Sequence, residues 1–167
     1  FTDVVCANAA GQGLVADGVD GSISSGGMPG DVNGDGSVNV QDIILIVNMI
    51  LDSDYSSAAD MNGDGSLNVQ DIILIVNMIL DSRAMDATRA EIQVAPGSLI
   101  LKADGFIGGV QMTLEHGNNF SIDVTDKAMV SDYRTSGNKT MVVIVVPESE
   151  ELFTYTGDFE IVDIMVV

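Results

Sequence analysis

Asp31-Val-Asn-Gly-Asp-Gly-Ser-Val-Asn-Val-Gln-Asp42 is followed directly by the apolar run Ile43-Ile-Leu-Ile-Val-Asn-Met-Ile-Leu51. The pattern returns as Asp60-Met-Asn-Gly-Asp-Gly-Ser-Leu-Asn-Val-Gln-Asp71, with the same apolar run behind it from Ile72 to Leu80. The two copies, repeat 1 and repeat 2 below, are letter-for-letter identical over 39–53 and 68–82. A polar loop followed by an apolar helix, present twice, therefore organises this part of the chain.

Each loop presents oxygen ligands at the spacing that a hard cation requires. In repeat 1, Asp31, Asn33 and Asp35 stand at alternate positions, and Gly36 stands at the sixth, where the backbone turns sharply. The main chain of the seventh residue and the side chains of the ninth and twelfth complete the set. This is the twelve-residue calcium loop of an EF-hand, with Asp instead of the usual Glu at position twelve.

The sequence therefore predicts two calcium ions, one in each repeat. An alternative is a pair of acidic turns, since Asp, Asn and Gly also dominate ordinary turns. The match of every ligand position in both loops favours calcium. The predicted ligands are Asp31, Asn33, Asp35, Ser37, Asn39 and Asp42 in repeat 1, and Asp60, Asn62, Asp64, Ser66, Asn68 and Asp71 in repeat 2.

Two such loops, each followed by one helix and with no helix leading in, resemble a dockerin domain of type I. Pro29 and Gly30 agree with this resemblance because both residues oppose a helix running into Asp31. The resemblance covers about half of the chain. It implies a calcium-stabilised plug that binds a cohesin domain and holds an extracellular assembly, such as a cellulosome, together.

The resemblance also implies where the partner is bound, namely at loop positions ten and eleven and on the helix behind them. Because both repeats carry the same residues there, a half-turn of the module presents the same face, which allows two binding orientations. The basic residues common on dockerin helices are missing, which favours a more apolar contact. The implied residues are Val40, Gln41, Val47 and Asn48 in repeat 1, and Val69, Gln70, Val76 and Asn77 in repeat 2.

The two helices are apolar nearly all round, which is typical of helices buried on more than one side. Two such helices in a small module do not hide every apolar side chain against each other. Either the remaining face packs on the C-terminal part of the chain, or it is a docking surface for a partner.

The chain from about residue 90 changes to a β pattern. About six β-branched segments separated by Gly, Asn and Pro predict an antiparallel β-sandwich of an Ig-like or cohesin-like kind. The strand-like stretch that starts at Gly108-Gly109 and the one that closes the chain resemble strands of a cohesin. The expected segments are 91–94, 98–103, 107–114, 120–124, 140–146 and 159–167.

The sequence thus predicts a multidomain α + β protein in three parts. Residues 1–29 form an N-terminal strand and linker segment, residues 30–83 the dockerin-like calcium module, and residues 90–167 the sandwich. Within the first part, 2–7 is expected to form one short strand. The last residues, Ile161 to Val167, are expected to form an edge strand that is free to pair with a partner.

Composition limits the function classes. With 25 acidic and 6 basic residues the net charge is −19, which excludes nucleic acid as a natural partner. No apolar run approaches the ~20 residues of a membrane span, so no membrane insertion is expected. The one histidine, His116, is expected in a turn, and no nucleophile motif, phosphate loop or transition-metal cluster is present, so we predict that the chain is not an enzyme.

Three interpretations remain at this stage. The first is an extracellular or cell-surface assembly module whose partner is a cohesin-like domain, possibly carried by another copy of this chain, giving a head-to-tail filament. The second is the C-terminal anchoring appendage of a secreted polysaccharide-degrading enzyme, which a dockerin implies. The third is a carbohydrate-binding accessory domain, against which the 5% aromatic content counts.

Overall fold

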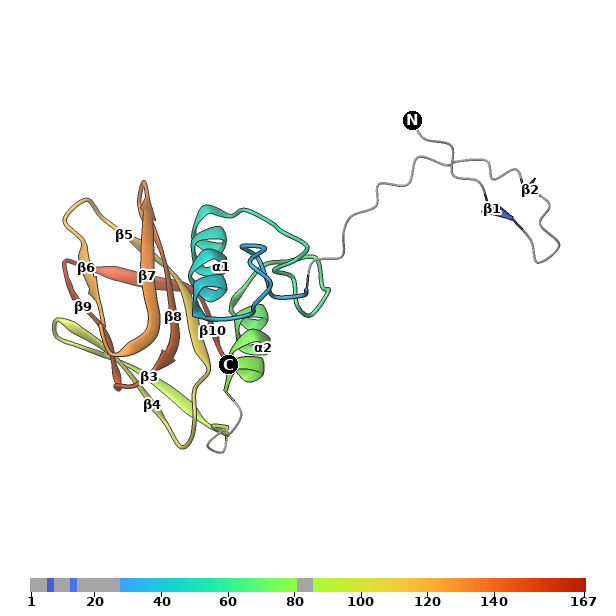
Figure 1. Ribbon diagram of the computed structural model, residues 1–167. Helices are drawn as coiled ribbons and strands as arrows, with labels where there is room; N and C mark the ends of the chain where they lie inside the picture. The colour runs from blue at the N-terminus through green and yellow to red at the C-terminus, as the bar shows by residue number, and fades with distance from the viewer. Residues whose placement is uncertain (1–5, 8–12, 15–27, 81–85) are drawn as a thin grey trace.

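A computed structural model describes residues 6–7, 13–14, 28–80 and 86–167 of the 167-residue chain. Two helices come first in the well-described part, and an antiparallel β-sandwich follows them (Figure 1). The elements are β1 (Cys6–Ala7), β2 (Gly13–Leu14), α1 (Val40–Asp52), α2 (Val69–Ile79), β3 (Ala90–Ala95), β4 (Ser98–Ala103), β5 (Gly109–His116), β6 (Ser121–Val124), β7 (Ala128–Ser136), β8 (Lys139–Pro147), β9 (Glu151–Thr156) and β10 (Phe159–Val166).

The helices begin where the polar loops end, and the reason is the same in both repeats. Asn39 caps α1 by accepting a hydrogen bond from the backbone N–H of Gln41, and the Asp42 carboxylate accepts one from the backbone N–H of Asn39. Asn68 and Asp71 build the same capping box for α2. These side chains satisfy backbone N–H groups that have no partner inside the helix.

The sandwich consists of two four-stranded antiparallel sheets. The helix-facing sheet has the strand order β10-β5-β8-β7, and the outer sheet has the order β3-β4-β9-β6. The α + β class and the sandwich predicted from the sequence are confirmed. The short strands β1 and β2 pair with each other and not with either of these sheets.

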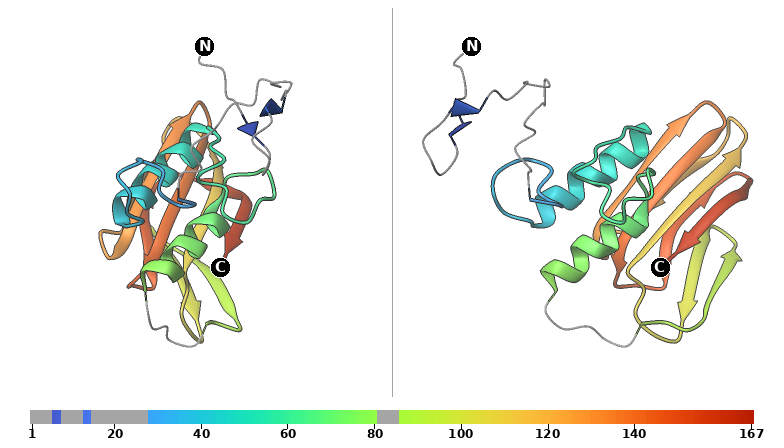
Figure 2. Two further views of the ribbon diagram at one scale, coloured as in Figure 1. Left: turned by 45° about the vertical axis from the view of Figure 1, so that its right-hand side comes forward. Right: turned by 90° about the vertical axis from the view of Figure 1, so that its right-hand side faces the viewer.

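The helices cover one face of the helix-facing sheet, so this part of the molecule has three layers (Figure 2). Helix α1 packs on β7 and β8, and α2 packs on β5 and β8. The apolar core between helices and sheet contains Val143 and Val145, whereas Val142 and Ile144 belong to the second core inside the sandwich. Strand β8 is thus buried on both faces, which explains its uninterrupted apolar run.

The strand count expected from the sequence was wrong, because eight strands follow residue 86 instead of about six. The missed strands are β7 and β9. Strand β7 lies at the edge of its sheet and exposes a polar second half, and β9 buries only Leu152 and Phe153 completely and begins inside an acidic stretch. Neither strand therefore carries the long apolar alternation that marks a strand in sequence.

His116 is the last residue of β5 and does not lie in a turn, which corrects the prediction for this residue. Its Nε2 is 2.8 Å from the Thr140 hydroxyl, and its ring stacks on Phe120 with 4.3 Å between centroids. These contacts give His116 a structural role within the sandwich.

Strand β10 forms one edge of the helix-facing sheet and pairs with β5 on its inner side. Its register with β5 shifts between Ile161 and Asp163, and Val162 and Ile164 are exposed. A bulge and a carboxylate on an edge strand both hinder pairing with a further strand. The expectation that this edge binds a partner therefore gains no support from its geometry.

Of the division into three parts, the boundary at residue 83 and most of residues 1–29 lie outside the described residues. Only Cys6–Ala7 of the expected strand at 2–7 is described, as β1. Within the described residues, neither helix is long and apolar enough to cross a membrane.

Candidate functional site: paired acidic loops and the helix–sheet contact

The first loop is held in shape by two aspartates that accept hydrogen bonds from its own backbone. Asp31 Oδ1 accepts from the N–H groups of Gly34 and Asp35 at 2.8 and 3.1 Å, and its Oδ2 accepts from Gly36 at 2.9 Å. Asp42 closes the loop from the helix, where its Oδ1 accepts from Val32 at 2.9 Å. Hydrogen bonds from backbone amides of the same loop thus hold the side chains at the first and twelfth positions.

The side chains between these two aspartates also fold back on the loop. The Asn33 Nδ2 donates to Asp35 Oδ2 at 2.9 Å, and the Ser37 N–H donates to Asp35 Oδ1 at 2.8 Å. Gly36 has φ 87°, a conformation that glycine adopts without strain. This positive φ is the physical reason for glycine at the sixth position.

The second loop repeats this geometry. Asp60 accepts from the N–H groups of Gly63 and Gly65 at 2.8 and 3.0 Å, and Asp71 Oδ1 accepts from Met61 at 2.9 Å. Gly65 has φ 83°. The two loops differ only at Val32/Met61 and Val38/Leu67, neither of which is a predicted ligand position, so both are candidate sites of the same kind.

Tyr55 adds a contact in repeat 2, and the corresponding position of the sequence in repeat 1 is Gly26, which has no hydroxyl group. The Tyr55 hydroxyl donates to Asp60 Oδ2 at 2.9 Å, and this bond is the leading cause that lowers the pKa of Asp60 below its usual value. Backbone N–H groups of the loop lower it further, against an opposing effect of burial. The same bond raises the pKa of Tyr55. Sequence reasoning missed Tyr55 because it precedes the loop motif.

The loops fit a hard cation in charge as well as in donor type. The sequence from Met28 to Leu80 contains no Lys and no Arg, and the Asp42 and Asp71 side chains are fully buried. Buried carboxylates without a basic partner are costly unless a cation compensates them. Within the described residues no three His, Cys, Asp or Glu side chains form a cluster by themselves. Besides carboxylates, the predicted ligand sets include Asn side chains and main-chain carbonyls, which are the donors of an oxygen-only calcium loop.

The predicted partner-binding positions have different surroundings in the two repeats. Val40 and Gln41 are exposed, the Val40 side chain by 37%, and Asn48 is half-buried. Val69, the counterpart of Val40, is completely buried, although Gln70 remains exposed. Identical sequences therefore have different environments, and the predicted equivalence of the two faces is lost in this arrangement.

Val47 and Val76 lie inside the apolar core that the helices share with the sheet. Together with Val69, they are buried within this chain in this conformation. The helix periodicity explains this, since these valines lie on the buried stripe of each helix. The first of the two alternatives for the apolar helices, packing on the C-terminal part, therefore holds for these residues.

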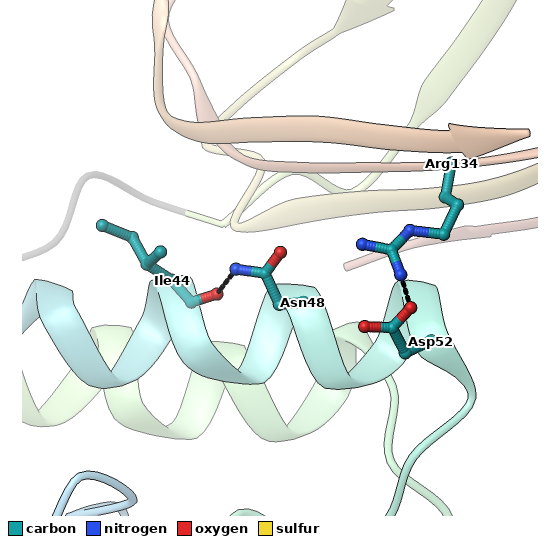
Figure 3. Close-up of polar contacts among 4 residues, drawn as sticks. All are labelled: Ile44, Asn48, Asp52 and Arg134. Carbon is teal, nitrogen blue, oxygen red and sulfur yellow. Dashed lines mark hydrogen bonds and ion pairs between the residues drawn. The ribbon is translucent and has the colours of Figure 1, made fainter.

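Asn77 lies beside a pocket of about 330 Å³ between the end of α2 and one end of the sandwich. Its Oδ1 is buried and has no hydrogen-bond partner among the residues that the structure describes. Its counterpart Asn48 donates its Nδ2 to the Ile44 carbonyl at 2.8 Å, one turn earlier in α1 (Figure 3).

Helix α2 meets the helix-facing sheet at the beginning of β5. The backbone N–H of Val69 donates to Gln111 Oε1 at 3.0 Å. A Cβ added to Gly109 would stand 2.4 Å from Val69 Cγ2, and one added to Gly108 would stand 2.5 Å from Ile73 Cδ1. The helix therefore approaches so closely that a side chain at either glycine would require Val69 or Ile73 to move.

Helix α1 contacts the sandwich at its C-terminal end. Arg134 on β7 forms an ion pair with Asp52, the last residue of α1 (Figure 3). Sequence reasoning did not single out Arg134, Asp52 or Gln111 as contact residues. Adjacent glycines at the start of a strand do signal a close backbone approach, so the pair at 108 and 109 was the available clue.

Comparison with known proteins gives a family match for the segment that contains the two repeats. Residues 29–80, roughly a third of the chain, match the family model described as the dockerin type I domain. No match was found among curated proteins or among solved structures. Dockerin type I domains bind calcium, mediate calcium-dependent binding to cohesin domains and occur in secreted cellulosomal proteins. Residues 29–80 of this chain are a dockerin type I domain, a non-catalytic interaction module, followed by a β-sandwich.

Proposed function

We propose that this chain is a non-catalytic, extracellular assembly module in which the calcium-stabilised dockerin domain docks on the helix-facing sheet of the sandwich. The supporting observation is the contact between the two parts. Val143 and Val145 are fully buried in the core that they share with α1 and α2. A buried apolar layer of this kind is typical of a stable protein–protein interface.

The proposed calcium sites are the two oxygen-rich loops, with one ion in each. Their role is to compensate the carboxylates of a segment that has eight Asp and no basic residue between positions 28 and 80. Those aspartates are Asp31, Asp35, Asp42, Asp52, Asp54, Asp60, Asp64 and Asp71. Without a cation, like charges within each loop repel one another and weaken the cap of each helix.

The proposed partner is a cohesin-like sandwich, either on another protein or on a second copy of this chain. Each chain carries both the helices and the sheet that they cover, so one copy can exchange its dockerin domain with the next. Such an exchange replaces contacts by identical contacts and therefore costs little. When the exchange continues from copy to copy, a head-to-tail filament results.

Light scattering of the full chain at increasing concentration tests the proposal. In millimolar calcium, the mean mass should rise with concentration, and excess chelator should return it to that of one chain. The double variant D35A/D64A should remain at the mass of one chain in calcium, because each loop has lost a central ligand. A single-chain mass in calcium at every concentration would contradict assembly between copies.

A further inference from the structure

The contact between α2 and β5 has the features of a recognition site. We propose that Gly108, Gly109 and Gln111 form a receptor site for the helix start Val-Gln-Asp-Ile-Ile, filled here by Val69–Ile73. This inference rests on the proposed function and names the residues on the sandwich that select the dockerin domain.

The first argument is steric. Gly109 faces Val69 Cγ2, and the 2.4 Å to an added Cβ is far below a van der Waals contact. Val69 is β-branched and lies in the first turn of a helix, so its side chain has little rotational freedom to move away. Gly108 faces Ile73 Cδ1, the far end of a more flexible side chain. The two glycines therefore allow α2 to approach β5 this closely. Gly109 tolerates a side chain less well than Gly108 does.

The second argument is polar. The N–H of Val69 lies in the first turn of α2, where backbone donors lack partners within the helix. Gln111 supplies an acceptor at 3.0 Å from a residue 42 positions away. A buried donor without a partner is costly. This bond therefore fixes where the N-terminal end of α2 lies on β5, in addition to which face of the helix meets the sheet.

The third argument comes from the duplication. Repeat 1 begins its helix with the same five residues, Val40–Ile44, yet Val40 is 37% exposed and Ile44 is 44% exposed. Val69 is completely buried and Ile73 is half-buried in the same roles. The chain therefore holds two copies of the recognised segment and one such receptor site within the described residues, and repeat 2 occupies it.

Amide hydrogen exchange in the full chain with calcium, followed by NMR, tests the site. Gly109→Ala should speed exchange of the amides from Val69 to Ile73 by about tenfold or more, because the helix has to move away from β5. Gly117→Ala is the matched control, since an added Cβ there meets nothing within 4 Å. It should leave these rates unchanged.

A rescue variant separates recognition from general damage. Val69→Ala removes the methyl group that an alanine at position 109 would meet, so V69A/G109A should exchange more slowly at α2 than G109A alone. Exchange of Leu99 and Phe153, inside the sandwich, reports whether each variant is folded. If Gly109→Ala does not fold, Gly108→Ala is measured in its place; it should speed exchange at α2 in the same direction but by less, because its Cβ meets chiefly the flexible side chain of Ile73.

The outcomes distinguish the two proposals. Wild-type amides from Val69 to Ile73 that exchange in calcium as fast as in an unfolded chain would contradict the docked arrangement itself, and with it the proposed function. Protected wild-type amides together with unchanged rates in G109A, or with no rescue in V69A/G109A, would overturn the receptor site and leave the proposed function standing.

Discussion

Val69 donates its backbone N–H to Gln111 across 42 positions of sequence, whereas Val40 begins an identical helix and is 37% exposed. The two valines occupy the same place in two copies of one sequence. Only the tertiary structure distinguishes them, because β5 lies against the second helix start and not against the first. This asymmetry provides matched pairs of variants for measurement.

Val69→Ala should lower the free energy of unfolding by about 2 kcal/mol, because it removes two methyl groups from a fully buried site. Val40→Ala should change it by less than about 0.5 kcal/mol, since the side chain is partly exposed and its loss leaves no cavity. Denaturant titration of both variants in calcium measures the difference. Equal effects at the two positions would show that the helices are not docked asymmetrically in solution.

Calcium removal should lower the stability of the dockerin domain strongly. With a dissociation constant of about 10 μM and about 1 mM free calcium, one ion adds about 2.7 kcal/mol to the unfolding free energy. Excess chelator should therefore lower the melting temperature of the wild type. The double variant D35A/D64A should melt at nearly the same temperature with calcium and with chelator.

The Asn39 and Asn68 caps provide an independent check on that prediction. These residues are the N-caps of α1 and α2, as well as candidate ligands at position nine of each loop. Replacing either Asn by Ala removes a cap worth about 1 kcal/mol whether calcium is present or not. If either Asn→Ala variant were less stable than the wild type in chelator but equally stable in calcium, the expected effect of calcium on these loops would be contradicted.

Arg134→Ala should change stability by less than about 1 kcal/mol, although the ion pair with Asp52 joins the sandwich to α1. The two side chains are 44% and 40% exposed, so water and salt screen their attraction. The difference between wild type and R134A should shrink further in high salt. A loss of several kcal/mol would mean that the pair is buried more deeply in solution.

Asp104 should make the stability of the sandwich sensitive to acid. Hydrogen bonds from the Thr88 hydroxyl, then from the backbone N–H groups of Arg89 and Thr88, hold the pKa of Asp104 below its ordinary value. A lowered pKa means that the ionised form stabilises the fold above about pH 4, the unfolded value, and that this contribution is lost as pH falls through the folded value.

Asp104→Asn keeps one acceptor oxygen but removes the charge, so it should be less stable than the wild type at neutral pH. The difference should narrow as the pH falls below about 4. Thermal melts of both proteins over this range measure it, with Asp123→Asn as a control at an exposed aspartate whose side chain forms no hydrogen bond with the residues that the structure describes. A difference that stays constant from neutral to acidic pH would contradict the role of the charge.

The sequence alone determined the local structure of the dockerin domain. The alternation of Asp and Asn up to Gly36 and Gly65 specifies each loop, because ligand spacing and a positive φ are local requirements. The caps at Asn39 and Asn68 and the apolar stripes behind them specify the helices in the same way. Most strands of the sandwich were also readable from their β-branched runs.

The tertiary structure decided what these elements contact. Strands β7 and β9 were missed because their stability comes from neighbouring strands and not from their own apolar pattern. The burial of Val47, Val69 and Val76 was missed because a helix that is apolar all round does not reveal which face meets the sheet. The helix starts at Val40 and Val69 have the same sequence, so the difference in their burial arises because β5 lies against the second helix start and not against the first. The loops and helix caps depend on residues that are close in sequence. The docking of the helices on the sheet depends on residues as far apart in sequence as Val69 and Gln111.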